Sequence, residues 1–487
     1  MTRICVTLTE PDTEGALRRM AERADVADLF EVRADLMTSV DLKALREGAP
    51  RPLVLTCRAA SQGGQMPDGD PARRETLVAG LDLGFDYVDV EAELLSSTVK
   101  AHAVGRRLVL SHHDLTGTPG DLEGRYQRMC EAGPEVVKIS VTPRTFADVG
   151  RVLALCEWVR ERGTVPLIAI AMGRLGTPTR LLAGRYDAPW MYSASVTGRE
   201  AAPGQLGVDA MARLYRVREV SRKTLVYGLL GTDVSRSLSP ALHNRAFAEL
   251  GMDAIFVPIS ADDLDAFWNA LPLLDLSGFS VTSPYKGDVV PRLSSVDEAA
   301  RRMASVNTVV RNGNGWTGAS TDGAGVVEPL AERTAIADKR VVILGAGGAA
   351  RAAVTALVAE GARVTMLARD VTRAAEAAAL SGCESGPLSL LPDLEWDVLI
   401  HATPVGQAPN EGESLVPSSL LRPGRIVFEM IYAPRETRLL REARAAGCVT
   451  IEGLEMLAAQ GVGQFEIWTG REAPREAMWT AAAEAAS

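Results

Sequence analysis

The sequence lacks several features that mark particular classes of protein. It has no excess of basic residues, because 52 Lys and Arg stand against 62 Asp and Glu, for a net charge of −10. This balance argues against a nucleic-acid partner and against an anionic membrane surface. No segment is long and apolar enough to span a bilayer, and residues 1–8 do not have the form of a signal peptide. We therefore expect neither a membrane nor a nucleic acid among its partners.

Cysteine is also scarce, and its six residues are scattered without CxxC spacing. This usage predicts reduced thiols in a cytoplasmic protein. The His, Cys and acidic residues form no cluster with the spacing of metal ligands, so we expect no metal. Small acidic substrates remain possible, because local groups of basic residues can bind them.

The chain has material for about three domains. Of its 487 residues, 47% are hydrophobic, which is enough to build cores. Segments of helical composition, such as 14–24 and 147–162, separate most of the short apolar runs in the first 217 residues. These runs are 4–8, 29–34, 53–58, 87–91, 108–112, 136–140, 167–171 and 191–194. Eight strand–helix units predict a (β/α)8 TIM barrel, in which active groups lie at the C-terminal ends of the strands.

One lysine, Lys138, stands in the middle of the sixth run. A strand of a parallel sheet is covered on both faces, and burial favours the neutral amine, which is a nucleophile for carbonyl carbon. A lysine at a strand end can equally extend to water. Polar residues at the other strand ends favour the site, because those ends meet at one rim of the barrel. They are Glu31, Arg33, Arg58, Asp89, Glu91, His112, His113, Asp114, Arg180 and Gln205.

The motifs around these residues resemble those of type I 3-dehydroquinate dehydratases, in the same order and over nearly all of residues 1–217. They are Glu31-Val32-Arg33, Arg58 followed by Gly63-Gly64, Ser111-His112-His113-Asp114, Val137-Lys138-Ile139, Arg180-Leu181-Leu182-Ala183-Gly184 and Ala202-Pro203-Gly204-Gln205. The resemblance implies Lys138 as the Schiff-base lysine, His113 as the general acid/base and Arg180 as the partner of the substrate carboxylate. It also implies that hydroxyl and carbonyl oxygens are held by Glu31, Arg33, Arg58 and Gln205.

Two positions depart from this family's pattern. Gln62 stands where a glutamate usually lies beside the catalytic histidine, and Ala201 stands where a serine is frequent. An amide can hold an imidazole by a hydrogen bond but cannot support its cation by charge. We expect a working dehydratase that is slower or has a shifted pH dependence. An aldolase-like Schiff-base lyase remains an alternative for the barrel.

In the second half, Ser237-x-Ser239-Pro240 has a good helix N-cap in Ser239 and a good first helical residue in Pro240. Such a helix start can bind an anion, although a capped helix with no ligand explains the sequence equally well. Residues 278–286 are expected to form a strand ending in a turn that presents Lys286, and another strand is expected at 304–310. Asp322 lies in a Gly-rich turn before a helix. A lysine and an aspartate at strand ends can pair and shuttle a proton to a carbonyl, or each can be a surface charge.

A strand at 340–344, a glycine loop and an alanine-rich helix follow, which is the setting of a dinucleotide-binding G-x-G-x-x-A motif. The loop residues are Gly345, Ala346, Gly347, Gly348 and Ala349. The next strand, 363–367, is followed by Arg369, Asp370 and Arg373. Two arginines there favour a ribose 2′-phosphate and hence NADP(H), while Asp370 could bind the 2′-hydroxyl of NAD or cap the next helix.

Residues 224–487 resemble shikimate dehydrogenase. The matching motifs are Ser237-x-Ser239-Pro240, Val281-Thr282-x-Pro284-x-Lys286, Val306-Asn307-Thr308, Thr321-Asp322-Gly323, the glycine loop and 456–460. The resemblance implies Lys286 and Asp322 as the catalytic pair and Ser237 and Ser239 at the substrate carboxylate. Ring hydroxyls would bind Thr282, Asn307 and Gln460. The cofactor would lie on the glycine loop, Arg369 and Arg373, with Thr403, Met430 and Gly453 near the nicotinamide. Ser280 and Ala368 stand where asparagine is usual.

The expected domains are a dehydratase barrel at 1–220, a substrate-binding domain at 221–330, a Rossmann NADP-binding domain at 331–451 and returning helices at 452–487. We expect the charged segment 213–223 to be the last barrel helix, joined directly to a strand at 224–229. The resemblances together predict a bifunctional enzyme that converts 3-dehydroquinate to 3-dehydroshikimate and then, with NADPH, to shikimate, in aromatic amino-acid biosynthesis.

The residues alone predict less than the resemblances do: an imine-forming barrel lyase joined to a Rossmann dehydrogenase. Two further alternatives remain at this stage. One is an NAD-dependent dehydrogenase half working in the catabolic direction on quinate or shikimate. The other is a protein without activity that senses NADP or serves as a scaffold. The sequence does not predict an oligomeric state.

Overall fold

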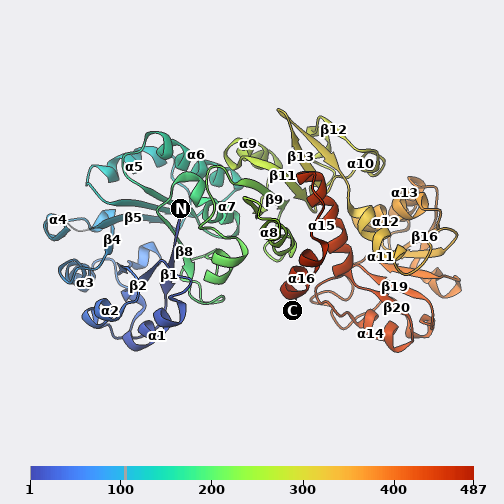
Figure 1. Ribbon diagram of the computed structural model, residues 1–487, viewed down its shortest axis with the longest axis horizontal. Coiled ribbons are helices and arrows are strands. Elements are labelled where there is room, and N and C mark those ends of the chain that lie inside the picture. The colour runs from blue at the N-terminus through green and yellow to red at the C-terminus, as the bar shows by residue number, and fades with distance from the viewer. Residues whose placement is uncertain (1, 104–106, 487) are drawn as a thin grey trace. The chain divides into compact units, whose positions relative to one another are not determined.

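The computed structural model describes residues 2–103 and 107–486. It divides into two compact units (Figure 1). One unit is Met1–Ser235 with Asp253–Leu276, and the other is Arg236–Met252 with Ser277–Ser487. Most strands of each unit are parallel and have helices packed against them, while the second unit also contains antiparallel pairs. The chain is therefore an α/β protein, as the sequence predicts.

The first unit contains a barrel of eight parallel strands. Their order is β7-β6-β5-β4-β3-β2-β1-β8, and the pairing of β8 with β1 curls the sheet into a nearly closed barrel. Every residue of the sixth strand is buried, as expected where both faces of a parallel sheet are covered. The strands are β1 (Arg3–Leu8), β2 (Leu29–Arg33), β3 (Leu53–Thr56), β4 (Tyr87–Glu91), β5 (Leu108–Asp114), β6 (Val136–Val141), β7 (Leu167–Ala171) and β8 (Trp190–Ala194). The eight predicted runs are therefore confirmed as the barrel strands.

Short helices surround the barrel, and aspartates begin several of them. The side chains of Asp12, Asp41, Asp70 and Asp121 each accept a backbone N–H of the helix that follows, which satisfies a group the helix itself leaves unpaired. The helices are α1 (Thr13–Arg23), α2 (Leu42–Gly48), α3 (Pro71–Asp82), α4 (Ser97–Ala103), α5 (Leu122–Cys130), α6 (Phe146–Arg162) and α7 (Thr177–Leu181).

The end of the barrel differs from the sequence prediction. A helix was expected over 213–223, but the structure has only a five-residue π-helix at Ala210–Leu214. Arg216 then takes a φ of +46°, a left-handed conformation that ends a helix. Turns lead from there into β9 (Leu225–Gly231).

Residues after the barrel pack directly on its outer helices. β9 pairs in parallel with β10 (Ala254–Ser260), and α9 (Leu264–Leu274) follows. The rings of Phe146 in α6 and Phe267 in α9 lie 6.1 Å apart, and Asp262 accepts the N–H of Phe146 at 2.9 Å. Arg185 binds Asp275 at 2.7 Å. This contact joins 253–276 to the barrel in one unit, although the expected domain boundary separates them.

The second unit begins with α8 (Ser239–Glu249). β11 (Leu276–Val281) pairs antiparallel with β13 (Thr308–Asn312), and β13 with β14 (Gly315–Ala319). β12 (Ser295–Val296), α10 (Glu298–Met303) and α11 (Asp322–Ala331) complete this part. Two predictions need correction. The N-cap of α8 is Leu238, so Ser239 and Pro240 are already helical, and β13 starts at Thr308 rather than 304 because Ala304, with φ +47°, still ends α10.

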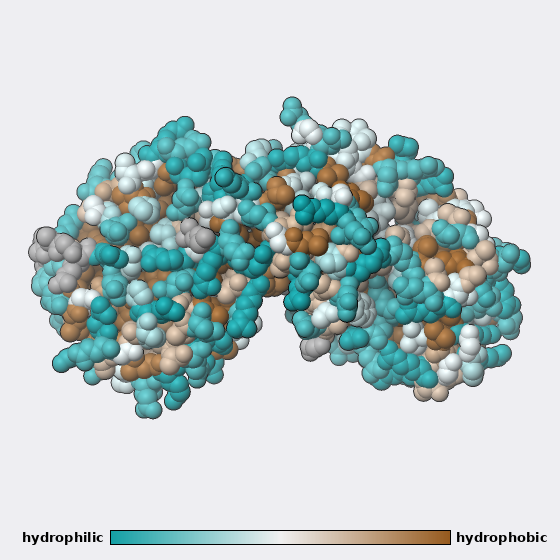
Figure 2. All heavy atoms as spheres, in the orientation of Figure 1, coloured by the Kyte–Doolittle hydropathy of each residue, from teal (hydrophilic) through white to brown (hydrophobic). Residues whose placement is uncertain are grey.

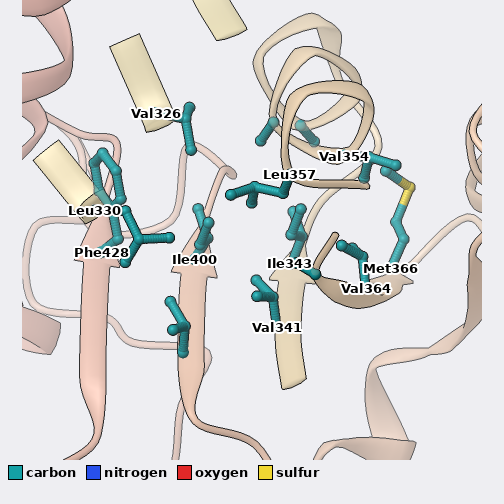
Figure 3. Packing of buried hydrophobic residues seen from close by; sticks show 14 of the residues in the cluster. Val326, Leu330, Val341, Ile343, Val354, Leu357, Val364, Met366, Ile400 and Phe428 are labelled. Atoms are coloured by element: carbon teal, nitrogen blue, oxygen red, sulfur yellow. The ribbon is translucent and has the colours of Figure 1, made fainter. Parts of the chain in front are cut away.

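A six-stranded parallel sheet with the order β17-β16-β15-β18-β19-β20 forms the predicted Rossmann domain. Val341, Ile343, Ile400 and Phe428 project from its strands onto Val354 and Leu357 of α12, and onto Val326 and Leu330 of α11 (Figure 3). The elements are β15 (Arg340–Leu344), α12 (Gly348–Ala359), β16 (Arg363–Ala368), α13 (Val371–Ala379), β17 (Glu384–Pro387), β18 (Val398–His401), β19 (Ile426–Glu429), α14 (Arg438–Ala445) and β20 (Val449–Ile451).

The chain then returns to the start of the second unit through α15 (Gly453–Thr469) and α16 (Arg475–Ala485). The rings of Phe465 in α15 and Phe247 in α8 lie 5.7 Å apart, and Trp468 lies 5.0 Å from His243. These contacts bury the apolar side of α8.

In the described part of the chain, no helix combines the length and apolar character needed to cross a membrane. Hydrophilic residues predominate on the face drawn in Figure 2, with hydrophobic residues scattered among them.

Candidate active sites

The predicted barrel residues surround one cavity at the C-terminal ends of the strands. Lys138, His113, Glu31, Arg33, Arg58, Arg180 and Gln205 all line it. They come from β2, the end of β3, β5, β6, α7 and the loop after β8. The structure thus brings together all the barrel residues to which the resemblance gives a role. Of the other polar residues expected at the strand ends, Asp89, Glu91, His112 and Asp114 do not line this cavity.

Lys138 is buried between carboxylates and a ring. Its Nζ donates to Asp89 Oδ2 at 3.0 Å, lies 3.6 Å from Glu31 Oε1, and stands 4.0 Å from the centroid of the Tyr192 ring. Its side chain is only 6% exposed, so it does not extend to water. The expectation of a buried amine agrees with this placement, while the two carboxylate partners were not anticipated.

Asp89 also holds Arg58. Arg58 Nη2 donates to Asp89 Oδ2 at 2.7 Å, and Ser111 Oγ donates to Oδ1 at 2.5 Å. Burial alone would raise the pKa of Asp89, but the charges of Arg58 and Lys138 outweigh it and hold that pKa well below its ordinary value. Asp89 is therefore an ionised anchor between two cations. The sequence placed it at a strand end without giving it a role.

Arg180 is a buried cation without an acidic partner among the described residues. It is 2% exposed, its Nη2 donates to the carbonyl oxygen of Pro203 at 3.2 Å, and its Nε has no hydrogen-bond partner in the described structure. Burial lowers the pKa of Arg180 to about 10. An unpaired guanidinium at the wall of a cavity fits a carboxylate of a ligand, since a buried charge is stabilised by pairing.

His113 faces the cavity from β5 and is held from behind by Gln62. Its backbone N–H and its Nδ1 lie 3.0 and 3.3 Å from Gln62 Oε1. Burial first, and then the charges of Arg58 and Lys138, hold the pKa of His113 well below 6.5, while Asp89 acts in the opposite direction. The imidazole is therefore neutral at neutral pH and can accept a proton.

Glu31 and Gln205 are fixed through a shared hydroxyl. Thr7 Oγ1 donates to Glu31 Oε2 at 2.8 Å and accepts from Gln205 Nε2 at 3.0 Å. Gln205 Oε1 accepts the backbone N–H of Ala201 at 2.9 Å. Arg33 binds Asp35 through two nitrogens, at 2.7 and 2.9 Å. Polar groups for ligand oxygens are thus already oriented.

The second site is an ion pair with an amide beside it. Lys286, in the turn after β11, donates to Asp322 Oδ2 at 2.5 Å, and Asn307 Nδ2 donates to Asp322 Oδ1 at 2.8 Å. Asn307 Nδ2 also lies within hydrogen-bond distance, 3.3 Å, of the side-chain oxygen Oε1 of Gln460 in α15, so Gln460 is linked to the pair through Asn307. These four predicted residues are connected, and the alternative that each charge is only a surface group is wrong.

The remaining predicted substrate residues lie at nearby element ends. Ser237 Oγ and Ser239 Oγ are hydrogen-bonded at 3.2 Å at the start of α8. Thr282 directly follows β11, four residues before Lys286. Ser280, the departure noted above, points instead to Gln464, whose Oε1 it reaches at 2.9 Å. Among the described residues, no hydrogen bond or ion pair joins Ser237, Ser239 or Thr282 to the Lys286–Asp322 pair.

The glycine loop fits a dinucleotide. Gly345 has a φ of +122°, and a Cβ there would lie 2.6 Å from the carbonyl oxygen of Ala402. At Gly347 and Gly348 a Cβ would meet only open space. No side chain of the described residues caps the start of α12, so its N–H groups are available to a phosphate. The strand order reverses between β15 and β18, which is where such sheets bind ligands.

The residues after β16 favour a 2′-phosphate. Asp370 caps α13 by accepting the N–H of Arg373 at 3.0 Å, so its carboxylate already has a structural partner. The side chains of Arg369 and Arg373 are exposed and have no ion pair among the described residues.

The predicted nicotinamide residues lie along the C-terminal ends of β18 and β19. The methyl group of Thr403 would touch a Cβ at Gly345 at 3.3 Å, and a Cβ at Gly453 would clash with the carbonyl oxygens of Met430 and Ile431. His401 joins Thr403 to the buried Glu429, at 2.6 and 2.8 Å, a link that the sequence did not suggest. Among the described residues, no group of three or more His, Cys, Asp or Glu is arranged to hold a metal ion.

Family models match three parts of the chain. Residues 4–222 match the type I 3-dehydroquinase family, 229–309 the shikimate dehydrogenase substrate binding domain, and 453–483 the shikimate 5'-dehydrogenase C-terminal domain.

Individual relatives extend over one half or nearly all of the chain. A shikimate dehydrogenase (NADP(+)) of Pyrococcus furiosus is 40% identical over 262 residues, which is 53% of this chain and 95% of the relative. The crystal structure of shikimate 5-dehydrogenase from Thermus thermophilus with NADP(H) and shikimate matches with a TM-score of 0.50 and 33% identity. It covers 54% of this chain and 99% of that chain. A chloroplastic bifunctional 3-dehydroquinate dehydratase/shikimate dehydrogenase of Arabidopsis thaliana is 32% identical over 482 residues, 93% of this chain and 79% of the relative. The chain therefore belongs to the bifunctional 3-dehydroquinate dehydratase/shikimate dehydrogenase family.

Proposed function

We propose that Lys138 forms a Schiff base with 3-dehydroquinate in the barrel and that the Lys286–Asp322 pair serves the reduction of the product. The protein is a bifunctional enzyme of the shikimate pathway: its dehydratase makes 3-dehydroshikimate, and its dehydrogenase reduces this to shikimate. One observation carries the assignment of the first site: a buried lysine and an unpaired buried arginine line the same cavity. A substrate that carries both a ketone and a carboxylate can react with the lysine amine and pair with the arginine guanidinium.

The amine of Lys138 attacks the ketone carbon, and the ketone oxygen leaves as water. The nucleophile is the uncharged amine, so the proton that the lysine gives up must end on the ketone oxygen, which needs two protons to leave as water. Asp89 and Glu31 hold the amine in place for this step. The resulting iminium draws electrons and acidifies the neighbouring C–H. Neutral His113 removes that proton and then returns it to the departing hydroxyl, which leaves as water. A second water hydrolyses the imine and restores the lysine.

Gln62 orients this histidine. A carbonyl oxygen only accepts hydrogen bonds, so its contact with Nδ1 requires the proton there and leaves Nε2 unprotonated for the cavity. Arg180 would bind the substrate carboxylate, and Glu31, Arg33, Arg58 and Gln205 its oxygen atoms.

At the second site, Lys286 and Asp322 would supply the proton that the carbonyl oxygen needs as it becomes a hydroxyl. Bound NADPH supplies the hydride, and the glycine loop, Arg369 and Arg373 would hold it. Ser237 and Ser239 would bind the substrate carboxylate, while Thr282, Asn307 and Gln460 would bind ring hydroxyls. Thr403, Met430 and Gly453 would border the nicotinamide. Thus the protein orients the reactants and moves one proton.

The experiment that tests this function follows NADPH consumption by the purified protein after addition of 3-dehydroquinate. Both half-reactions are needed for a signal, so consumption requires both sites. An NAD-dependent enzyme of quinate or shikimate breakdown would prefer NADH, and comparison of the two cofactors separates it. A protein with an inactive barrel would consume NADPH with 3-dehydroshikimate but not with 3-dehydroquinate.

We further propose the domain limits 1–220, 221–330, 331–451 and 452–487, and a cytoplasmic location. All six cysteines are free thiols, which suits a reducing compartment. Limited proteolysis at the proposed boundaries and fractionation of the source cells test these two statements.

A further inference from the structure

Behind Gln62 stands a carboxylate that the proposed mechanism does not yet use. Gln62 Nε2 donates to Glu93 Oε2 at 2.9 Å, while Gln62 Oε1 faces His113. Glu93 belongs to the short 3-10 helix Ala92–Leu94 after β4. The amide therefore connects a carboxylate to the imidazole, with one hydrogen bond on each side.

The state of Glu93 decides which end of the Gln62 amide faces His113. The hydrogen bond from His112, 3.0 Å from Glu93 Oε1, lowers the pKa of Glu93 to about 2, so the carboxylate is an acceptor only. It must then face the NH2 side of Gln62, which turns Oε1 towards His113. The backbone N–H of His113 supports the same orientation at 3.0 Å.

We propose that Glu93 is a positioning residue of the dehydratase: through Gln62 it fixes His113 in the tautomer protonated on Nδ1 and supplies the negative charge that the Gln62 amide lacks. The inference rests on the proposed role of His113 as general acid/base. The Gln62 amide has no charge with which to stabilise the imidazolium of His113. In this protein the carboxylate of Glu93, which is hydrogen-bonded to the far side of Gln62, supplies that charge.

Several other charged residues surround His113. Arg33, Arg58, Lys138 and Asp89 act on it from the cavity side. On the outer side, Arg125 Nη1 lies 3.2 Å from His112 Nδ1, next to Glu93. Asp114 follows His113 in β5. None of these residues is altered when Glu93 and Gln62 are substituted.

The test compares the pH dependence of dehydratase kcat/KM in the full-length protein and two variants. Glu93→Gln removes the charge and should lower kcat/KM at neutral pH about tenfold. Its acid limb should move about half a pH unit lower, because the imidazolium loses a stabilising charge. The double variant Gln62→Glu/Glu93→Gln keeps one carboxylate and one amide in reverse order. It should recover activity, with an acid limb about one pH unit above that of the wild type.

Two controls separate positioning from folding. The side chain of Glu93 is 55% exposed, so its exchange leaves the core intact. Glu47→Gln makes the same charge change on the outer helix α2, at a side chain 68% exposed, and should leave the profile unchanged. Dehydrogenase activity of each preparation reports on the second unit. Equal profiles for wild type, Glu93→Gln and the double variant would overturn the proposal.

A second measurement does not depend on turnover. The protein has five histidines, so the ring nitrogens of His113 can be assigned by NMR. The proposal requires a proton on Nδ1 and none on Nε2 in the wild type, and a mixture of tautomers in Glu93→Gln. A wild type protonated on Nε2 would overturn it. Absence of turnover with a correct tautomer would refute the proposed function and leave the positioning role standing.

Discussion

Replacing Arg180 with methionine should separate activity from stability. Burial moves the pKa of Arg180 from 12.5 to about 10. At about 1.4 kcal/mol per pH unit, the buried charge costs the folded barrel about 3 kcal/mol at neutral pH. Methionine removes that cost but leaves the carbonyl of Pro203 without its donor, a loss of about 1 kcal/mol. The variant should therefore be more stable than the wild type by about 2 kcal/mol.

The same change should damage catalysis. A charge-assisted hydrogen bond to the substrate carboxylate contributes about 2–4 kcal/mol, so dehydratase kcat/KM should fall roughly 30- to 1,000-fold. Steady-state kinetics and urea unfolding measure the two effects. Arg174→Met is the matched control, because Arg174 lies exposed in the 3-10 helix Arg174–Gly176 before α7. A less stable variant with unchanged kcat/KM would show that Arg180 is a packing residue.

Three further outcomes are expected. Lys138→Ala should abolish dehydration and spare reduction, and Lys286→Ala should do the reverse; loss of both activities from either change contradicts separate sites. Arg369→Ala combined with Arg373→Ala should raise KM for NADPH well above any change for NADH, whereas equal changes argue against a 2′-phosphate site. His113 stays neutral when folded but binds a proton near pH 6.5 when unfolded, so wild-type stability should fall as the pH drops below 6.5. His113→Asn should weaken that dependence in urea titrations, and an unchanged slope would refute it.

The barrel and its rim could be predicted because parallel strands follow a simple rule. Apolar runs at regular spacing give the strands, and residues just after them meet at one edge whatever the details of packing. That rule placed Lys138, His113 and Arg180 at one cavity. It could not show that Asp89 joins Lys138 to Arg58, because the period of a strand fixes which face a side chain occupies but not its partner.

The incorrectly predicted helix and strand bounds each have their cause in the backbone conformation of one residue. Helical composition at 213–223 did not reveal that Arg216 adopts a positive φ, and charged residues tolerate helix or turn equally. The strand expected at 304–310 begins later than predicted, because Ala304 also adopts a positive φ. The Gln62–Glu93 contact joins loops after two different strands and has no signal in local sequence.

Covalent trapping tests the central claim most directly. The protein is incubated with 3-dehydroquinate, treated with borohydride, digested and weighed by mass spectrometry. The account predicts a reduced adduct on the peptide containing Lys138 and none in Lys138→Ala. Continued turnover of 3-dehydroquinate by the wild type without any adduct on Lys138 would contradict it.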